Sequence, residues 1–425
     1  MKQLLRDCYA AVLRELDVRR AFASVAASHL AALGDARLLV IAFGKAARPM
    51  AEALLEHVDA SRLRGLLVPP AGDDAPLGPF EVLPGGHPLP DAGSLAAGVR
   101  ALQLARSVAS DEHVVFLVSG GGSAMLELPA DPAVMLDELR ALHRALVGSG
   151  ADIHTINTVR RHLSALKGGR LALAAAAART QLTLAISDVP DARPQSLASG
   201  ATVADPSTLD DCRAILDRHS LWPVLPASLR ERCRRGDLPP PLAPGDALLQ
   251  RCEFVVLLDE AAARRAAVRW LEERDVVAVE DQHTDDWPCE RAAAALLQRL
   301  DQLAAANPGR ACAVVCSGEL SVPLPASPGR GGRNQQFVLT CTGAIADRDR
   351  AVLSCGTDGI DGDSPAAGAV ADGATAARAA ALGLDVPRHL ARCDAYPLFE
   401  QLGDAVVTGP SGMNVRDLRV LLTRG

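Results

Sequence analysis

The chain has 425 residues, which is long enough for two or three domains, and 49% of them are hydrophobic, which is enough for a buried core. The formal net charge of −7 disfavours a nucleic-acid partner, because contacts with phosphates require clustered lysine and arginine. Ten scattered cysteines without a Cys-x-x-Cys pair indicate free thiols in a reducing cytoplasm. No signal peptide or membrane span is predicted, so we expect a cytoplasmic protein.

The first half of the chain alternates short apolar runs with alanine- and leucine-rich helical patterns. Two amphipathic helices are expected at about residues 1–16 and 18–33. A strand at about 37–42 and a helix from Lys45 follow. Further strands are expected at 64–69, 79–83, 113–118 and 180–186, and helices at 91–109 and 131–148. This alternation is typical of a parallel α/β sheet, whose ligands bind at the carboxyl ends of the strands.

A proline-rich segment at residues 237–245 cannot form regular structure and is interpreted as a linker. The alternation then restarts, with strands expected at 252–258, 275–280 and 311–316 and helices at 259–273 and 288–305. The sequence therefore predicts two α/β domains, at residues 1–240 and 246–425.

Lys45 stands directly after the apolar run Val40-Ile-Ala-Phe and a glycine, at the predicted start of a helix. The amino terminus of a helix attracts anions, and a lysine there adds a full positive charge. Only Lys2, Lys45 and Lys167 are lysines among 44 basic residues, so each retained lysine is a candidate for a role that arginine cannot fill. A solvated lysine in the first turn remains the alternative.

A glycine loop follows the most apolar predicted strand. It reads Ser119-Gly120-Gly121-Gly122-Ser123, and three glycines in a row can present successive backbone N–H groups to an anion. An ordinary tight turn rarely needs three glycines, so the pattern favours phosphate binding. Neither a Walker loop nor a Gly-x-Gly-x-x-Gly fingerprint occurs in the chain.

A basic helix face is predicted next, because Arg160, Ser164 and Lys167 recur at helical spacing before Gly168-Gly169. These side chains could converge on a phosphate. A solvated basic face explains the same pattern.

Acidic residues follow three further predicted strands. Asp188, Glu319 and Asp358 each stand just after an apolar run, a position that suits a metal ligand or a catalytic carboxylate, although turn and cap residues explain such acids too. Arg330 and Arg333, in Gly329-Arg-Gly-Gly-Arg, suit bidentate recognition of a carboxylate or phosphate.

The order of these motifs resembles the glycerate 2-kinases whose second half is called the MOFRL domain. The resemblance runs from Phe-Gly-Lys-Ala-Ala through Gly-Gly-His-Pro, Ser-Gly-Gly-Gly-Ser, Ile-Asn-Thr-Val-Arg, Leu-Lys-Gly-Gly-Arg and Ser-Asp-Val-Pro. It continues through Arg-Gly-Gly-Arg-Asn-Gln, Gly-Thr-Asp-Gly-Ile-Asp-Gly and Thr-Gly-Pro-Ser-Gly-Met-Asn, so it covers nearly the whole chain.

This resemblance implies a first domain that is Rossmann- or flavodoxin-like with a parallel sheet, a smaller α/β MOFRL-type domain, and an active site in the interdomain cleft. It implies ATP, Mg²⁺ and glycerate, with 2-phosphoglycerate as the product, and we allow for a homodimer. The residue roles that we expect are as follows: catalytic, Lys45, Asp188, Arg330 and Arg333; ATP-binding, Ser119, Gly120, Gly121, Gly122, Ser123, Lys167 and Asn414; substrate-binding, Lys45, Arg160, Arg330, Arg333 and Asp358; metal-binding, Asp188, Glu319 and Asp358.

Two alternatives remain open at this point. A reductase that uses NADH or NADPH on hydroxypyruvate would share the fold class, although the dinucleotide fingerprint is missing. A non-catalytic binder of phosphorylated hydroxy acids would use the same loops without turnover. His87 and His162 are interpreted as structural histidines, since no pair of histidines has the spacing of metal ligands.

Overall fold

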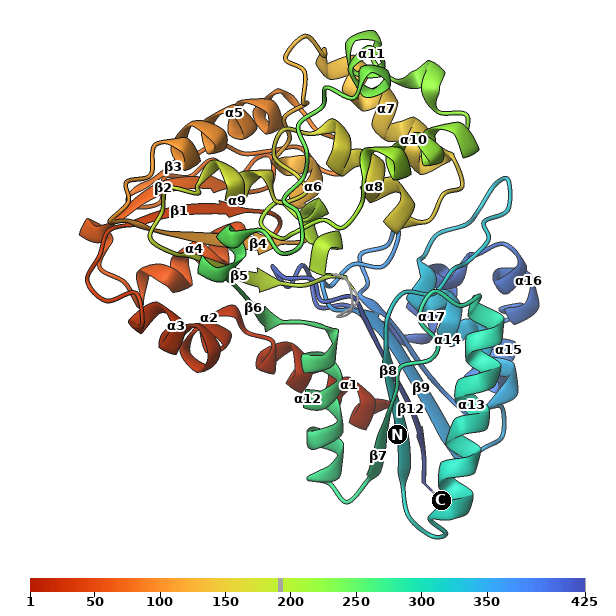
Figure 1. Cartoon of the computed structure of the whole chain (residues 1–425). Helices are drawn as coiled ribbons and strands as arrows, with labels where there is room; N and C mark the ends of the chain where they lie inside the picture. Colours follow the sequence, from red (N-terminus) through yellow and green to blue (C-terminus); the bar gives the residue numbers. More distant parts are fainter. Residues whose placement is uncertain (190–193, 425) are drawn as a thin grey trace. The chain divides into compact units, whose positions relative to one another are not determined.

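A computed structural model describes residues 1–189 and 194–424 (Figure 1). The chain forms two compact units. We call Val18–Leu257 the N-terminal unit, and Leu258–Gly425 together with Met1–Asp17 the C-terminal unit. Within the described residues, no helix is long and apolar enough to cross a membrane.

The N-terminal unit is built on a six-stranded sheet with the order β3-β2-β1-β4-β5-β6. The pairs from β3 to β5 are parallel, which confirms the predicted parallel sheet. Strands β1, β4 and β5 are buried along their whole length, as expected for a sheet covered on both faces. The strands are β1 Leu38–Phe43, β2 Leu63–Val68, β3 Phe80–Val82, β4 His113–Ser119, β5 Gln181–Ile186 and β6 Cys252–Leu258.

The expected helix at 18–33 is interrupted, because a π-helical stretch, Phe22–Ala26, separates α2 from α3. The apolar faces of α7, α8, α10 and α11 form a satellite cluster of leucines and cysteines separate from the sheet core. The helices of this unit are α2 Val18–Ala21, α3 Ala27–Ala31, α4 Ala47–Leu55, α5 Ala92–Arg106, α6 Gly122–Met125, α7 Leu136–Gly148, α8 Ile153–Leu163, α9 Arg170–Ala174, α10 Leu209–Arg218 and α11 Ala227–Arg235.

The C-terminal unit contains a second six-stranded sheet, in the order β11-β10-β9-β12-β8-β7. This sheet is mixed: β7 and β8 are parallel, whereas β12 runs antiparallel to both β8 and β9. Its strands are β7 Val277–Asp281, β8 Cys312–Ser317, β9 Arg350–Gly356, β10 Gly368–Asp372, β11 Ala405–Val406 and β12 Asp417–Thr423. Its helices are α1 Lys2–Glu15, α12 Glu260–Glu272, α13 Cys289–Ala306, α14 Arg333–Ala344, α15 Thr375–Ala381, α16 Val386–Ala391 and α17 Ala395–Leu402.

The first helix, α1, belongs to the C-terminal unit although it opens the chain. The buried Tyr9 hydroxyl donates a 2.6 Å hydrogen bond to the carbonyl of Gly356, and Lys2 Nζ lies 2.9 Å from Asp404 Oδ1. The proline-rich segment lies inside the N-terminal unit, where the Leu242 amide donates to the Gly168 carbonyl at 2.8 Å. The boundaries of the compact units therefore differ from the expected domain ranges 1–240 and 246–425, because α1 buries its apolar face in the unit that follows residue 257.

Candidate functional site

Lys45 is joined to the glycine loop at the carboxyl ends of β1 and β4. The Lys45 amide donates to the carbonyl of Gly120 at 2.9 Å, and the Ala46 amide donates to Ser119 Oγ at 2.9 Å. Gly44 permits this approach, because its φ is +115° and a Cβ there would overlap the Ser119 side chain. The structure thus brings the first two predicted motifs together.

The glycine loop itself turns through a left-handed residue. Gly121 has φ 82° and is followed directly by α6, and a left-handed residue next to right-handed ones is the backbone pattern of anion-binding nests. A Cβ on Gly121 would lie 3.1 Å from Lys45 Cγ and 3.2 Å from His87 Cδ2. A positive side chain and anion-binding backbone geometry therefore share one small region.

Asp188, which follows β5, packs against the same loop, since a Cβ on Gly120 would overlap its carboxylate oxygen Oδ2. The parallel pairing of β4 with β5 explains this placement, because Ser119 and Ile186 are register partners at the carboxyl ends of the two strands. Lys45, the glycine loop and Asp188 are therefore gathered at one edge of the sheet. The rest of the Ser-Asp-Val-Pro motif continues into residues 190–193, outside the described part of the chain.

The sequence predicts a structural role for His87, yet this side chain lies beside Gly121 and within range of the Lys45 charge. Desolvation and the Lys45 ammonium together lower the pKa of His87 to about 4, so its imidazole is neutral at physiological pH. The motif Gly-Gly-His-Pro was the only sequence signal for this placement.

Lys167 occupies the protein interior rather than a ligand-facing surface. Its ammonium forms an ion pair with the buried carboxylate of Glu127, which also lies 3.5 Å from His143 Nε2. Burial raises the pKa of Glu127, but the opposite effect of Lys167 and His143 is larger, so the pKa falls to about 2. The Lys167 charge balances Glu127 in this structure, so we leave Lys167 out of the proposed ATP-binding set.

Arg160 lies on α8, close enough to this interior group for the Glu127 charge to act on it, although burial lowers its pKa overall. Its Nε is buried and has no hydrogen-bond partner among the described residues. A guanidinium with an unsatisfied donor is suited to an anionic ligand, so Arg160 stays in the proposed substrate-binding set.

The C-terminal unit contains a cavity of about 660 Å³ that several predicted residues share. Its polar lining includes Arg333, Asp358 and Asn414, and its apolar lining includes Leu320 and Ile360. The sequence thus identified three residues of one cavity from motifs that are as much as 81 positions apart (414 − 333).

The two predicted arginines differ in their partners. Arg333 donates to Asp417 Oδ2 at 2.6 Å and to Glu319 Oε2 at 2.9 Å, and these two acids together raise its pKa despite burial. Arg330 is exposed, and its guanidinium lies 5.0 Å from the centre of the Tyr396 ring. Because Arg333 is already neutralised by two carboxylates, Arg330 is the better candidate for binding a substrate carboxylate.

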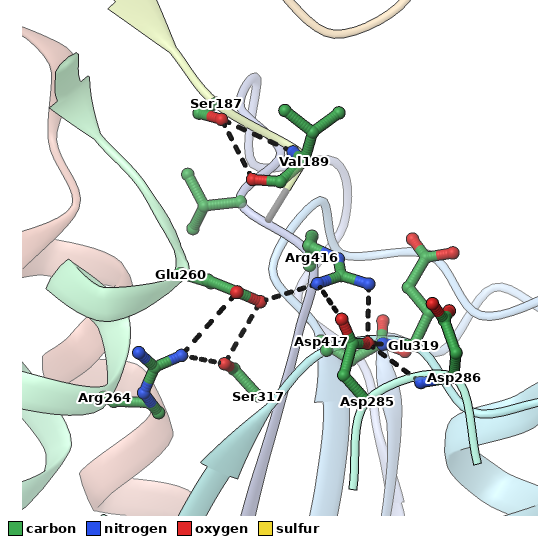
Figure 2. A network of polar contacts seen from close by, with 12 residues as sticks. Ser187, Val189, Glu260, Arg264, Asp285, Asp286, Ser317, Glu319, Arg416 and Asp417 are labelled. Atoms are coloured by element: carbon green, nitrogen blue, oxygen red, sulfur yellow. Dashed lines mark hydrogen bonds and ion pairs between the residues drawn. The ribbon is translucent and has the colours of Figure 1, made fainter. Parts of the chain in front are cut away.

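A polar network fixes the backbone beside Glu319 (Figure 2). The Glu319 amide donates to Asp285 Oδ1 at 2.9 Å, and Asp285 is held by the two terminal guanidinium nitrogens of Arg416, at 2.7 and 2.8 Å. Arg416 Nη1 also donates to Glu260 Oε2 at 2.9 Å. Such bidentate, charge-assisted bonds specify geometry as well as energy, so the loop after β8 is held in one conformation.

Side-chain carboxylates accept hydrogen bonds from the backbone N–H groups of the Gly-Arg-Gly-Gly-Arg loop. The Arg330 amide donates to Asp394 at 2.9 Å, and the Gly331 amide to Asp363 at 2.8 Å. The Asn334 and Gln335 amides of α14 both donate to Asp361, at 3.1 and 2.9 Å, and burial raises the pKa of that acid to about 6. This loop therefore offers arginine side chains, whereas the glycine loop of the N-terminal unit offers backbone.

Among the described residues, no three His, Cys, Asp or Glu side chains are placed to hold an ion. Of the expected metal ligands, Asp188 belongs to the N-terminal unit, and Glu319 and Asp358 belong to the C-terminal unit. Glu319 fits poorly, because it lies 2.8 Å from the Arg333 guanidinium. Asp358 Oδ1 accepts a hydrogen bond from the Ile360 amide at 3.1 Å. Asp188 and Asp358 remain proposals for this role.

The N-terminal unit is an α/β structure that presents Lys45, the glycine loop and Asp188 at the carboxyl edge of a parallel sheet. This placement is typical of enzymes that handle phosphorylated ligands. Two family models match the chain. Residues 3–234 match the domain of unknown function DUF4147, and residues 312–417 match the MOFRL family. The chain belongs to this DUF4147–MOFRL family, which confirms the predicted resemblance.

Named relatives cover most of the chain. It is 32% identical to a glycerate 2-kinase of Pyrococcus horikoshii, over 91% of this chain and 87% of that protein. It is 34% identical to human glycerate kinase, over 91% and 84%. The crystal structure of a glycerate kinase from Thermotoga maritima matches with a TM-score of 0.87 and 30% identity over 99% of both chains.

Proposed function

We propose that this protein transfers the γ-phosphoryl group of ATP to D-glycerate and forms 2-phosphoglycerate. The observation that carries the proposal is the junction of Lys45 with the glycine loop, because phosphoryl transfer depends on positioning and charge neutralisation. The relatives named as glycerate kinases support the reaction class. The choice of the 2-hydroxyl rests on two relatives by name, the glycerate 2-kinase of Pyrococcus horikoshii and a D-glycerate 2-kinase of Thermotoga maritima, which is 33% identical over 90% of this chain.

In this proposal the N-terminal unit handles the phosphates. The backbone of Gly120–Ser123 binds the ATP phosphates, and Lys45 neutralises the charge that develops on the transferring group. Asp188, packed on Gly120, accepts the proton of the attacking hydroxyl. Mg²⁺, when bound, would neutralise further phosphate charge.

The C-terminal unit contributes Arg330 to bind the glycerate carboxylate, and Asp358 and Asn414 line the cavity beside it. Arg333 holds Glu319 and Asp417 in place, and it serves as a positioning residue for the cavity that it lines. This assignment modifies the expected role of Arg333, since its donors already serve two carboxylates.

The deciding experiment measures ADP release in the presence of ATP, Mg²⁺ and D-glycerate, and then identifies the product with enolase in the absence of a mutase. Direct conversion by enolase is expected, because enolase acts on 2-phosphoglycerate. Two relatives from Agrobacterium vitis carry the name hydroxypyruvate reductase provisionally. Loss of NADH with hydroxypyruvate, without ADP release, would replace the kinase proposal with that activity.

Replacing Gly120 with alanine tests the role of Asp188. The new Cβ would overlap Asp188 Oδ2 and must displace the carboxylate, and a displacement of about 1 Å can reduce turnover about 100-fold. The matched control is Gly148→Ala at the end of α7, where nothing lies within 4 Å of an added Cβ. Equal kcat for the two variants in the ADP-release assay would remove Asp188 from the reaction.

A further inference from the structure

A strained turn packs against the glycine loop. Ala198, Ser199 and Gly200 all have left-handed φ values, 47°, 54° and 64°. Two consecutive non-glycine residues in this region are costly and persist only where the surroundings hold them. Gly122 lies against this turn, since its added Cβ would be 3.0 Å from Ala198 Cβ.

The surroundings do hold this turn firmly. The carbonyl of Ser199 accepts the Gly168 amide at 3.2 Å, and the carbonyl of Gly200 accepts the Gly169 amide at 2.7 Å. The Ser199 side chain is completely buried. A polar side chain kept in a strained, fully buried position indicates that its hydroxyl has a specific partner.

The partners of that hydroxyl form a directed chain. Ser199 Oγ donates to Asn157 Oδ1 at 3.2 Å and lies 2.9 Å from Ser123 Oγ. A hydroxyl has one proton, and we assign the Ser199 proton to the hydrogen bond with Asn157 Oδ1, which can only accept. Ser123 then donates to Ser199, and only lone pairs remain on the partly exposed Ser123 oxygen.

We infer that Ser199 is a positioning residue that fixes the Ser123 hydroxyl as a hydrogen-bond acceptor for the 3-hydroxyl of glycerate, the alcohol that is not phosphorylated. The attacking 2-hydroxyl gives its single proton to Asp188, so only the 3-hydroxyl has a proton for Ser123. Phosphate oxygens are acceptors themselves and cannot bond to an oxygen that presents only lone pairs. This inference rests on the proposed function and gives the two parts of Ser123 different tasks: its backbone belongs to the phosphate loop, and its side chain to the alcohol.

The variant Ser199→Gly separates this role from a structural one. Glycine adopts φ 54° without strain, so folding should be preserved or improved while the hydroxyl is lost. We expect kcat/KM for glycerate to fall about tenfold, the upper end for one hydrogen bond. The affinity for a non-hydrolysable ATP analogue, measured by calorimetry, should stay within about twofold.

The matched control is Ser196→Ala, because the buried Ser196 hydroxyl lies in the same segment and has no hydrogen-bond partner among the described residues. The Ser123→Ala variant should resemble Ser199→Gly, and combining the two should cost no more than Ser123→Ala alone, since Ser199 acts through Ser123. Three results would each overturn the inference while leaving the proposed function intact. The losses in kcat/KM of the two single variants could multiply in the double variant, Ser199→Gly could match Ser196→Ala in kcat/KM, or Ser199→Gly could bind the nucleotide tenfold more weakly. Absence of ADP release from the unmodified protein would instead overturn the proposed function, and this inference with it.

Discussion

Replacing Lys45 with arginine is expected to reduce kcat by about 100- to 1000-fold, the loss seen when one preorganised charge-stabilising group is removed. The exchange keeps the positive charge but replaces a compact ammonium with a wide planar fork. The Lys45 side chain runs beside the glycine loop, since its Cγ would lie 3.1 Å from a Cβ on Gly121. The measurement is ADP release at saturating ATP and glycerate.

The reciprocal exchange Arg48→Lys serves as the control. Arg48 is the second residue of α4 and pairs with Asp73 at 2.6 Å, so a lysine there should leave turnover nearly unchanged. Titration of His87, followed by NMR, reports whether residue 45 carries a positive charge, independently of turnover. The pKa of His87 should remain near 4 in Lys45→Arg and rise in Lys45→Met, which lacks the ammonium. Near-normal turnover of Lys45→Arg would refute the assigned role of Lys45.

The gathering of Lys45, the glycine loop and Asp188 could be predicted because a parallel sheet collects the carboxyl ends of its strands at one edge. Each of these residues follows an apolar run in the sequence, and the register pairs Phe43 with Val118 and Ser119 with Ile186. The sequence pattern therefore contained both the order of the motifs and their common edge.

Other features depend on partners that the sequence does not mark. Lys167 attracted attention as a rare lysine, yet its carboxylate partner Glu127 is 40 positions away (167 − 127) in a segment without a motif. Tyr9 bonds to Gly356 across 347 positions, and this contact places α1 in the C-terminal unit. Ser199 was missed because an alanine and a serine in left-handed conformation leave no compositional signal, unlike glycine.

The Lys167→Met variant is expected to lose about 3–5 kcal/mol of stability, because removing one partner of a buried ion pair leaves the other charge uncompensated. Lys167 and Glu127 are both almost completely buried. Urea denaturation at neutral pH measures the loss. The effect must also depend on pH: the pKa of Glu127 in the folded protein, about 2, is below its ordinary value of 4.5. The pair therefore contributes its full stability above pH 4.5 and loses it as the pH falls toward 2, so the difference from the unmodified protein should shrink on acidification.

Combining Lys167→Met with Glu127→Gln gives the matched control. In the unmodified protein, Ser164 Oγ and the Leu128 amide donate to Glu127 Oε1 at 3.0 and 2.9 Å. Glutamine keeps an acceptor for these two donors but carries no charge. The double variant should recover much of the lost stability, because no unpaired charge is then buried. Equal destabilisation of the single and double variants at every pH would show that Lys167 contributes packing alone. In that case its ammonium would again be a candidate for a ligand, as the sequence first indicated.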